Sequence, residues 1–272
     1  MLFPILLLAL LMQDKSREIP VKESGGFQYV EEGEGEVIIC LHGLFGALSN
    51  FRDFIFHFEE RYQVVIPMLP LYTLPTSETN LNGYVNFVQE FIAHKGYSNV
   101  VLLGNSLGGH IGLMYALENL PNVRGLVLTG SSGLFENSLG ATFPKKSDYE
   151  FVKNKTAETF YDPACATKEL VDEVFEIIND REKAIRIIYT AKSAIRQNLR
   201  SEVHKIDCPT LLVWGKQDTI TPPFVGELFD ELMPNSELVF LDKCGHAAMM
   251  EVPEPFNAAM DAWLSKLPIT KD

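Results

Sequence analysis

From Phe27 onward, short apolar runs alternate with longer segments whose apolar residues have helical spacing. The runs that predict strands are Phe27–Glu31, Val37–Leu41, Gln63–Leu69, Asn99–Gly104, Arg124–Thr129, Thr210–Trp214 and Glu237–Leu241. The segments that predict helices are Asn50–Glu60, Leu81–His94, Leu107–Leu120, Pro223–Leu232 and Pro253–Leu267. Several strands are almost continuously apolar, as expected where both faces of a sheet are covered. The alternation predicts an α/β fold, with a mostly parallel sheet and helices on both faces.

The alternation stops between residues 131 and 205, where the sequence predicts no strand. Two amphipathic helices are predicted there instead, over Lys168–Ile178 and Glu182–Gln197. Their apolar stripes consist of Leu170, Val171, Val174, Phe175 and Ile178 in the first helix and of Ala184, Ile185, Ile188, Ala191 and Ile195 in the second. We predict an α/β core formed by residues 25–130 and 206–268. Residues 131–205 then form an all-helical lid over the carboxyl edge of the sheet, where open α/β sheets bind ligands.

Residues 104–109, GNSLGG, lie between a predicted strand and a predicted helix. Glycines two residues before and after Ser106 match the G-x-S-x-G pattern, in which a tight strand-to-helix turn presents a serine hydroxyl at the sheet edge. The alternative is a glycine-rich helix start that serves only packing or anion binding. A nucleophilic serine also needs a base and a group that orients this base.

Two polar residues downstream of Ser106 fill these roles. Asp218 follows the predicted strand Thr210–Trp214, and His246 follows the next one, Glu237–Leu241. Because the carboxyl ends of parallel strands meet at one edge of a sheet, we expect all three side chains to lie together. Asp242 is closer to His246 in sequence and is the alternative acid, although a lone Asp in such a loop usually forms a turn or caps a helix.

These residues together resemble the α/β-hydrolase superfamily. The resemblance is carried by LHGLFG at 41–46, GNSLGG at 104–109, LLVWGKQDTITP at 211–222 and CGHAAMMEVPEPF at 244–256, and it covers roughly residues 25 to 268. It implies Ser106 as the nucleophile, His246 as general base and then acid, and Asp218 as the group that orients the histidine.

The same resemblance implies an oxyanion hole made of two backbone N–H groups. One belongs to the residue after the nucleophile, Leu107, and the other to the loop that follows the early strand Val37–Leu41. Leu44 is the first candidate for the second donor, and Phe45 is the alternative. Glycines at positions 43 and 46 allow this loop the backbone shape that the site needs.

Serine at position 106 excludes relatives that need an aspartate nucleophile, namely haloalkane dehalogenases and typical epoxide hydrolases. Asn105 and the length of the lid resemble the carbon–carbon bond hydrolases of aromatic breakdown and related carboxylesterases. Those carbon–carbon hydrolases usually have tryptophan where this chain has Ala247, and a lid arginine where it has Ile178. In the loop 67–75, PMLPLYTLP, an apolar, proline-rich stretch replaces the Asp and the G-x-G-x-S turn of most relatives.

A ring-fission product carries a carboxylate, for which arginine is the suited partner. Arg181 and Arg186 fall off the lid stripes and are predicted to face solvent, while the loop Leu69–Pro75 adds apolar surface and no cation. We therefore predict a carboxylesterase-like serine hydrolase that cleaves a small, largely apolar ester through an acyl-enzyme. The alternatives are a carbon–carbon bond hydrolase of ring-fission products and a non-enzymatic ligand receptor on the same fold.

The formal net charge of −13 argues against nucleic acid or an anionic membrane surface as the main partner, and favours a small-molecule substrate. The four cysteines are Cys40, Cys165, Cys208 and Cys244. They lie far apart without zinc-type spacing, so neither a metal nor a cofactor is predicted. Cys244, two residues before His246, lacks a turn motif of its own and is predicted to be structural. The oligomeric state is not predicted.

Residues 1–12, MLFPILLLALLM, are apolar throughout and too few to span a bilayer as a helix. They have the length of a signal-peptide core but lack a preceding Lys or Arg and an A-x-A site. Two interpretations stay open: a signal-like segment, or sequence that precedes a true start at Met12. The prediction is a cytoplasmic protein, or a secreted or periplasmic one if the segment is a signal.

Overall fold

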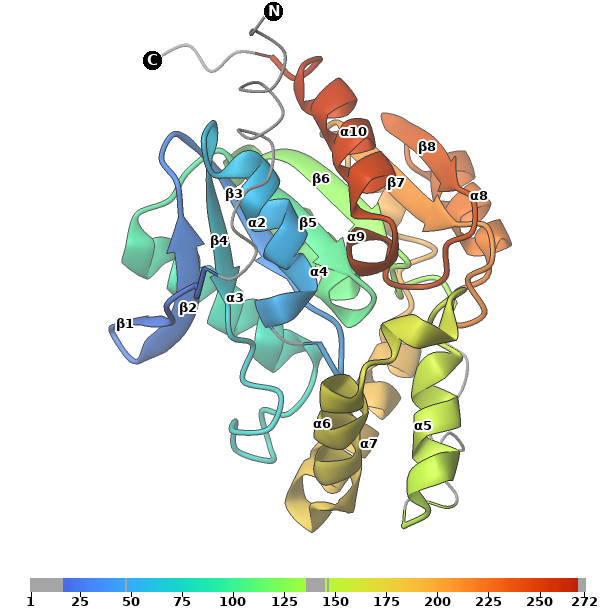
Figure 1. The fold of residues 1–272 in the computed structure, drawn as a ribbon. Helices are drawn as coiled ribbons and strands as arrows, with labels where there is room; N and C mark the ends of the chain where they lie inside the picture. The colour runs from blue at the N-terminus through green and yellow to red at the C-terminus, as the bar shows by residue number, and fades with distance from the viewer. Residues whose placement is uncertain (1–16, 47, 136–144, 146, 269–272) are drawn as a thin grey trace, which may run out of the picture.

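The computed structural model describes residues 17–46, 48–135, 145 and 147–268 (Figure 1). The apolar segment 1–12 lies outside the described residues. Within the described part, no helix is long and apolar enough to cross a membrane.

The described residues form one eight-stranded sheet, ordered β1-β2-β4-β3-β5-β6-β7-β8. Its strands are β1 (Lys22–Ser24), β2 (Phe27–Glu32), β3 (Glu36–Leu41), β4 (Tyr62–Pro67), β5 (Val100–Asn105), β6 (Val123–Thr129), β7 (Thr210–Gly215) and β8 (Ser236–Leu241). β2 is antiparallel to both of its neighbours, and every other pair is parallel. The mostly parallel sheet is confirmed. The sequence did not predict β1, because this short edge strand is polar.

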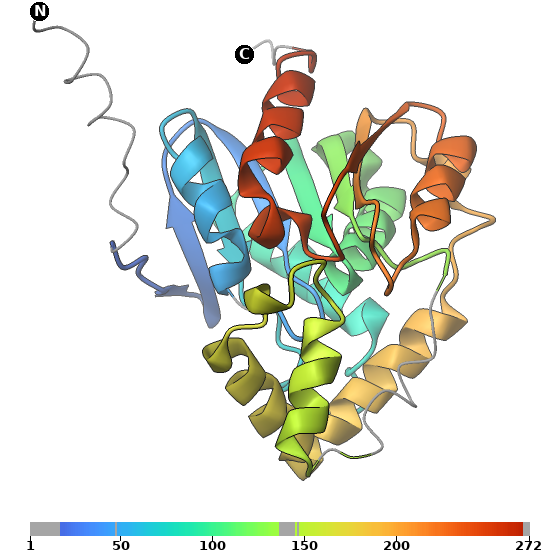
Figure 2. The same cartoon turned by 45° about the vertical axis from the view of Figure 1, so that its right-hand side comes forward.

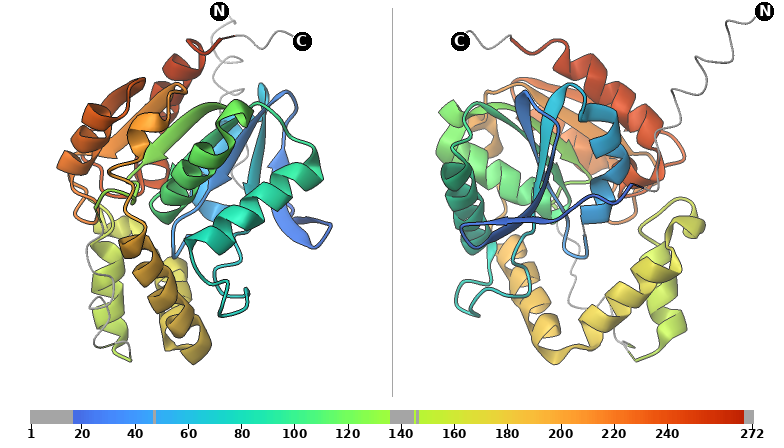
Figure 3. Two further views of the ribbon diagram at one scale, coloured as in Figure 1. Left: turned by 180° about the vertical axis from the view of Figure 1, so that it is seen from behind. Right: turned by 60° about the vertical axis from the view of Figure 1, so that its left-hand side comes forward.

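Helices cover both faces of the sheet, as predicted (Figures 1 and 3). One face packs against α2 (Arg52–Phe58), α9 (Ala248–Glu251) and α10 (Pro253–Leu264), and the other against α3 (Leu81–Lys95), α4 (Leu107–Asn119) and α8 (Pro223–Leu232). Alternate residues of β5 enter the two layers: Val101 and Leu103 contact the first, Val100 and Leu102 the second. Because both faces are covered, every residue of β5 is buried, which explains its continuous apolar run.

In the described part of the connection from β6 to β7, three α-helices lie below the carboxyl ends of the strands (Figure 2). These are α5 (Tyr149–Ala157), α6 (Lys168–Asn179) and α7 (Arg181–Arg196), called here the helical insertion. Each begins at a side-chain cap, from Asp148, Thr167 and Asp180 respectively. The sequence did not predict α5, whose buried side chains are only Val152 and Thr156.

The predicted apolar stripe of α7 is only partly buried: Ile185 and Ile188 are 38% and 45% exposed, while Ile195, 47% exposed, lines the cavity described below. The helix instead docks through small and polar side chains. The hydroxyls of Tyr84 and Thr190 are 2.7 Å apart, and the backbone N–H of Leu81 donates to Ser193 Oγ at 3.1 Å. The predicted stripe counted apolar residues alone, so it did not include these hydroxyls.

The first turn of α4 packs directly on the backbone of β3. A Cβ at Gly108 would lie 2.0 Å from the carbonyl oxygen of Leu41, whereas a Cβ at Gly112 would make ordinary contact with Leu126 Cδ1 at 3.5 Å.

We expect Gly108→Ala to lower the free energy of unfolding by at least about 2 kcal/mol, because the backbone of α4 or β3 must move to admit the methyl group. Its control on the same helix, Gly112→Ala, should raise this free energy by up to about 1 kcal/mol. Urea unfolding followed by circular dichroism measures both, and equal effects would contradict this account of the turn.

Candidate active site

Ser106 occupies the sharp turn between β5 and α4. Its backbone φ of 55° and ψ of −118° lie in a region that residues other than glycine rarely adopt. A Cβ at Gly104 would come within 2.5 Å of the backbone of Gly109, so the two arms of the turn approach too closely for side chains. The glycines that suggested the G-x-S-x-G pattern therefore serve the close approach that this turn requires.

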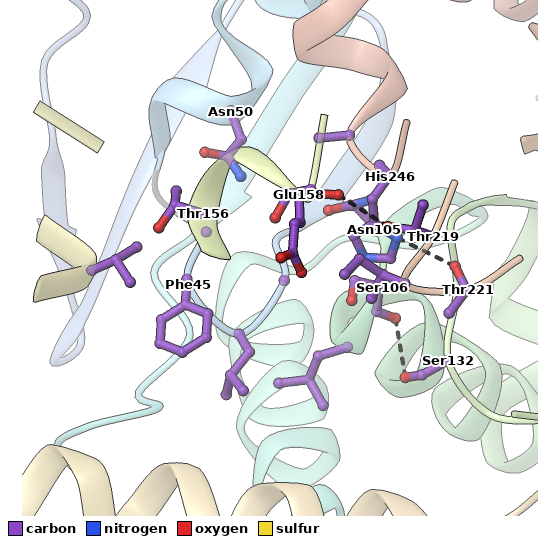
Figure 4. Close-up of a pocket in the computed structure, with 18 of the residues that line it drawn as sticks. Phe45, Asn50, Asn105, Ser106, Ser132, Thr156, Glu158, Thr219, Thr221 and His246 are labelled. Carbon is purple, nitrogen blue, oxygen red and sulfur yellow. Dashed lines mark hydrogen bonds between the residues drawn. The ribbon is translucent and has the colours of Figure 1, made fainter. Parts of the chain in front are cut away.

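The structure brings Asp218 and His246 together. Asp218 follows β7 and His246 follows β8, and the distance from His246 Nδ1 to Asp218 Oδ2 is 2.9 Å. Both side chains are buried, with 7% of the histidine and none of the aspartate exposed. Ser106 and His246 line the same cavity (Figure 4). The three residues selected by chain order thus lie at one edge of the sheet.

Hydrogen bonds around Asp218 determine its charge and the tautomer of His246. Its Oδ1 accepts the backbone N–H groups of Ile220 and Thr221 at 2.8 and 2.9 Å, and its Oδ2 accepts the hydroxyl of Thr221 at 2.9 Å. Burial by itself raises the pKa of Asp218, but the attraction to His246 and the donated hydrogen bonds outweigh it, so the pKa is lowered. A carboxylate can only accept, so Nδ1 of His246 carries a proton, and in the neutral ring the lone pair is then on Nε2.

The backbone of His246 is held on both sides. Its N–H donates to the carbonyl of Thr159 in the helical insertion at 2.8 Å, and its carbonyl accepts Nδ2 of Asn105 at 3.1 Å. A Cβ at Gly130 would lie 2.8 Å from His246 Nδ1, so the ring rests on this glycine. Sequence analysis did not find Thr159 or Gly130, because neither belongs to a recognisable motif.

The alternative acid, Asp242, lies away from the histidine. Its side chain is 63% exposed and accepts a hydrogen bond from Gln217 Nε2 at 3.3 Å, which is the largest cause of its lowered pKa. Cys244 is buried, and burial raises the pKa of its thiol to about 12. A thiol of such high pKa is a poor nucleophile at neutral pH, in keeping with the predicted structural role.

Residues 43–46 form a tight turn beside the serine, called here the oxyanion turn. The N–H of Gly46 donates to the carbonyl of Gly43 at 3.0 Å, which leaves Leu44 and Phe45 at the two central positions. A Cβ at Gly43 would lie 3.2 Å from Ser106 Cβ, which shows how closely the turn approaches the serine. Leu44, Phe45 and Leu107 all line the cavity, and their roles as N–H donors stay predictions.

His42 holds the oxyanion turn from the outside. Its Nε2 accepts the backbone N–H of Leu69 at 3.2 Å, so Nδ1 carries the proton and donates to the carbonyl of Gly43 at 2.9 Å. Burial lowers the pKa of His42, which favours the neutral ring that this arrangement needs. The loop after β4 therefore contacts the turn through a histidine of fixed tautomer.

The cavity has a volume of about 510 Å³ and lies between the sheet edge and the helical insertion. Apolar side chains contribute much of its wall, including Phe45, Phe135, Leu170, Val174 and Ile195. Among the described residues, its charged lining side chains are Lys155 and Glu158, and Lys155 Nζ contacts the Glu158 carboxylate at 2.7 and 3.0 Å. Among the described residues, no group of three His, Cys, Asp or Glu side chains could hold a metal ion.

Two predictions about the surroundings of the cavity are wrong: that Arg186 faces solvent and that the loop Leu69–Pro75 contributes to the cavity wall. Arg181 is exposed as expected, but the Arg186 side chain is only 16% exposed and its Nε donates to the carbonyl of Leu74 at 3.3 Å. Neither arginine, nor any other among the described residues, lines the cavity. The loop Leu69–Pro75 does not line it either, because this loop lies behind the oxyanion turn, which it supports through His42.

The sequence model of the alpha/beta hydrolase fold family matches residues 36–253. The chain belongs to this family. Among solved structures, MGS-MChE2, an alpha/beta hydrolase enzyme from a metagenome of sediments from the lagoon of Mar Chica, Morocco, is similar. It is 42% identical, its TM-score is 0.76, and the match covers 91% of this chain and 98% of that one.

Two curated relatives cover most of this hydrolase. One, from Metapseudomonas resinovorans, is named 2-hydroxy-6-oxo-6-(2'-aminophenyl)hexa-2,4-dienoic acid hydrolase; it is 29% identical, over 89% of each chain. The other is Lipase 1 of Psychrobacter immobilis, which is 29% identical over 82% of this chain and 75% of its own. Similarity thus extends to a lipase and to a dienoic acid hydrolase, and the chain is a hydrolase enzyme.

The two acidic residues give a matched test of the site. Asp218→Asn should reduce kcat by about 10⁴-fold, because an amide cannot hold His246 in the required tautomer. Asp242→Asn should change kcat by less than about twofold, since its side chain is exposed and away from the histidine. The measurement is kcat of both variants and of the wild type, by steady-state kinetics on any substrate that the wild type hydrolyses. A larger loss in the Asp242 variant would reassign the acid.

Proposed function

We propose that this hydrolase is a carboxylesterase-like serine enzyme that cleaves a small, neutral, largely apolar ester. The observation that carries the proposal is the His246–Asp218 hydrogen bond of 2.9 Å beside a cavity that the strained Ser106 also lines. This arrangement supports the assignment of Ser106 as the nucleophile, of His246 as the base through Nε2 and of Asp218 as the anion that orients the base.

In the proposed reaction, Ser106 Oγ attacks the ester carbonyl carbon while His246 Nε2 takes the hydroxyl proton. Negative charge on the former carbonyl oxygen is stabilised by backbone N–H groups, from Leu107 and from Leu44 or Phe45. Collapse of this tetrahedral species breaks the bond to the alkoxy oxygen, which leaves as alcohol with the proton from His246. Water then attacks the acyl-enzyme, passing a proton to His246, and the acid departs as the proton returns to Ser106.

Electrostatics in the cavity favour a neutral substrate. A substrate carboxylate inside an apolar cavity needs a cationic partner, because an unpaired buried charge is costly. In the described part of the cavity wall the cation is Lys155, which is already bonded to Glu158. An anionic substrate would have to compete with this carboxylate and would also meet its charge.

Carbon–carbon bond cleavage of a ring-fission product is the second candidate function, favoured by the likeness to the dienoic acid hydrolase. Ser106 and His246 can serve either chemistry, so the site itself does not separate them. The cavity differs from what such a substrate needs, since its described lining holds Ala247 and no arginine. A receptor that does not turn over its ligand is the third interpretation, and detection of catalysis excludes it.

The first test is removal of the nucleophile. Ser106→Ala should reduce kcat for neutral short-chain esters by about 10⁴-fold or more, because the members of such a triad act as a unit. Labelling with a fluorophosphonate and peptide mass mapping should place the label on Ser106 in the wild type. Near-native turnover by the variant, or a label on another residue, would refute the assignment of the nucleophile.

The Lys155–Glu158 pair gives the test of substrate charge. Glu158→Gln frees Lys155, so kcat/KM for the hemi-ester of a dicarboxylic acid should rise by about three- to tenfold relative to a neutral ester of equal length. Lys155→Gln should shift this ratio the opposite way, because Glu158 is then unpaired. Both shifts should shrink in high salt. If the two variants have equal ratios of kcat/KM for the hemi-ester and the neutral ester, the Lys155–Glu158 pair does not select substrates by charge. Efficient turnover of a ring-fission dienoate by the wild type would instead favour carbon–carbon bond cleavage.

A further inference from the structure

The oxyanion turn is bound by a side chain outside the cavity. The hydroxyl of Tyr72 donates to the carbonyl oxygen of Leu44 at 2.6 Å. Tyr72 belongs to the proline-rich loop 67–75. We propose that Tyr72 is a positioning residue that orients the oxyanion turn for the transition state. This inference rests on the proposed esterase function.

Peptide geometry gives the hydrogen bond its effect. A trans peptide is planar, and its N–H points opposite to its carbonyl. The bond from Tyr72 to the Leu44 carbonyl therefore fixes the direction of the Phe45 N–H, which belongs to the same peptide. The preceding peptide is fixed likewise, because the Gly43 carbonyl is held by His42 and Gly46. Both candidate donors, Leu44 and Phe45, thus have directions set from outside the cavity.

Tyr72 is itself well held. Its ring packs against the buried core formed with α3 and α4, and the ammonium group of Lys183 lies 5.9 Å from the ring centre. Burial is the largest cause that raises the pKa of the Tyr72 hydroxyl, so this group stays protonated and able to donate at neutral pH. Three residues earlier in the same loop, the backbone N–H of Leu69 donates to His42 Nε2. One loop therefore supports both peptides of the turn.

The position of Tyr72 predicts which kinetic constant depends on it. The residue does not line the cavity, so a bound ester does not touch it. Charge develops on the carbonyl oxygen only in the transition state, and the N–H donors must already point at it. Loss of the hydroxyl should therefore lower kcat and leave KM unchanged, as expected for an interaction that is realised only in the transition state.

Tyr72→Phe removes only the hydroxyl and provides the test. The matched control is Tyr97→Phe, which also removes a bonded hydroxyl: Tyr97 donates to the Glu31 carboxylate at 2.7 Å, away from the cavity. Titration with a fluorophosphonate measures the concentration of competent sites in each preparation. Because kcat is then calculated per competent site, unfolded protein does not lower it. We expect Tyr72→Phe to lower kcat for a neutral ester by about tenfold, with KM within about twofold, whereas Tyr97→Phe keeps both.

An inhibitor that forms an oxyanion provides the second measurement. The serine adduct of a trifluoromethyl ketone places a negative oxygen where the transition state does, so Tyr72→Phe should weaken its binding by the same factor as kcat. Unchanged kcat, a loss that falls mainly on KM, or equal losses in Tyr97→Phe would each overturn the role of Tyr72. Failure of the proposed function is recognised separately, because the wild type would then turn over no ester or Ser106→Ala would stay active.

Discussion

The close approach of backbone segments around Ser106 is the constraint on which the rest of the site depends. The chain must leave β5, reverse its direction and begin α4 within a few residues, while the first turn of α4 lies against the carbonyl oxygen of Leu41 at the end of β3. Ser106 is held in a strained conformation that costs on the order of 1–3 kcal/mol, and the buried layers on both sides of β5 offset that cost. The same packing leaves no room for a side chain at Gly104 or Gly108.

The loops that carry the proposed triad are also bonded to the helical insertion and to the helix after His246. The backbone of His246 is bonded to Thr159 on one side and to Asn105 on the other, while Glu251 accepts the N–H groups of Asp162 and Gly245 at 2.7 and 2.6 Å. The histidine is therefore placed by three segments that are distant in sequence. The proposed base and the roof of the cavity form one hydrogen-bonded unit.

Chain order predicted the sheet and the proposed triad, because parallel strands bring successive loops to one edge and leave little freedom in where Ser106, Asp218 and His246 meet. Features that depend on contacts between segments were not predictable in this way. Arg186 lies off an apolar stripe and yet contacts the carbonyl of Leu74, and α7 docks through hydroxyls. Tyr72 also has no motif, and its contact with Leu44 becomes visible only when the loop after β4 is folded.

The ring of Phe45 has a consequence for substrate entry. Its backbone belongs to the oxyanion turn, but its side chain packs into the small core that Val152, Val174 and Ile178 form inside the helical insertion. A motion that separated α5 from α6 would withdraw this ring from that core or displace the turn to which it is attached. For the proposed esterase, admission of a bulkier acyl group and alignment of the proposed oxyanion donors are thus coupled through one residue, and we expect substitutions in α6 that enlarge the cavity to alter the rate of the chemical step as well as the size of the substrate.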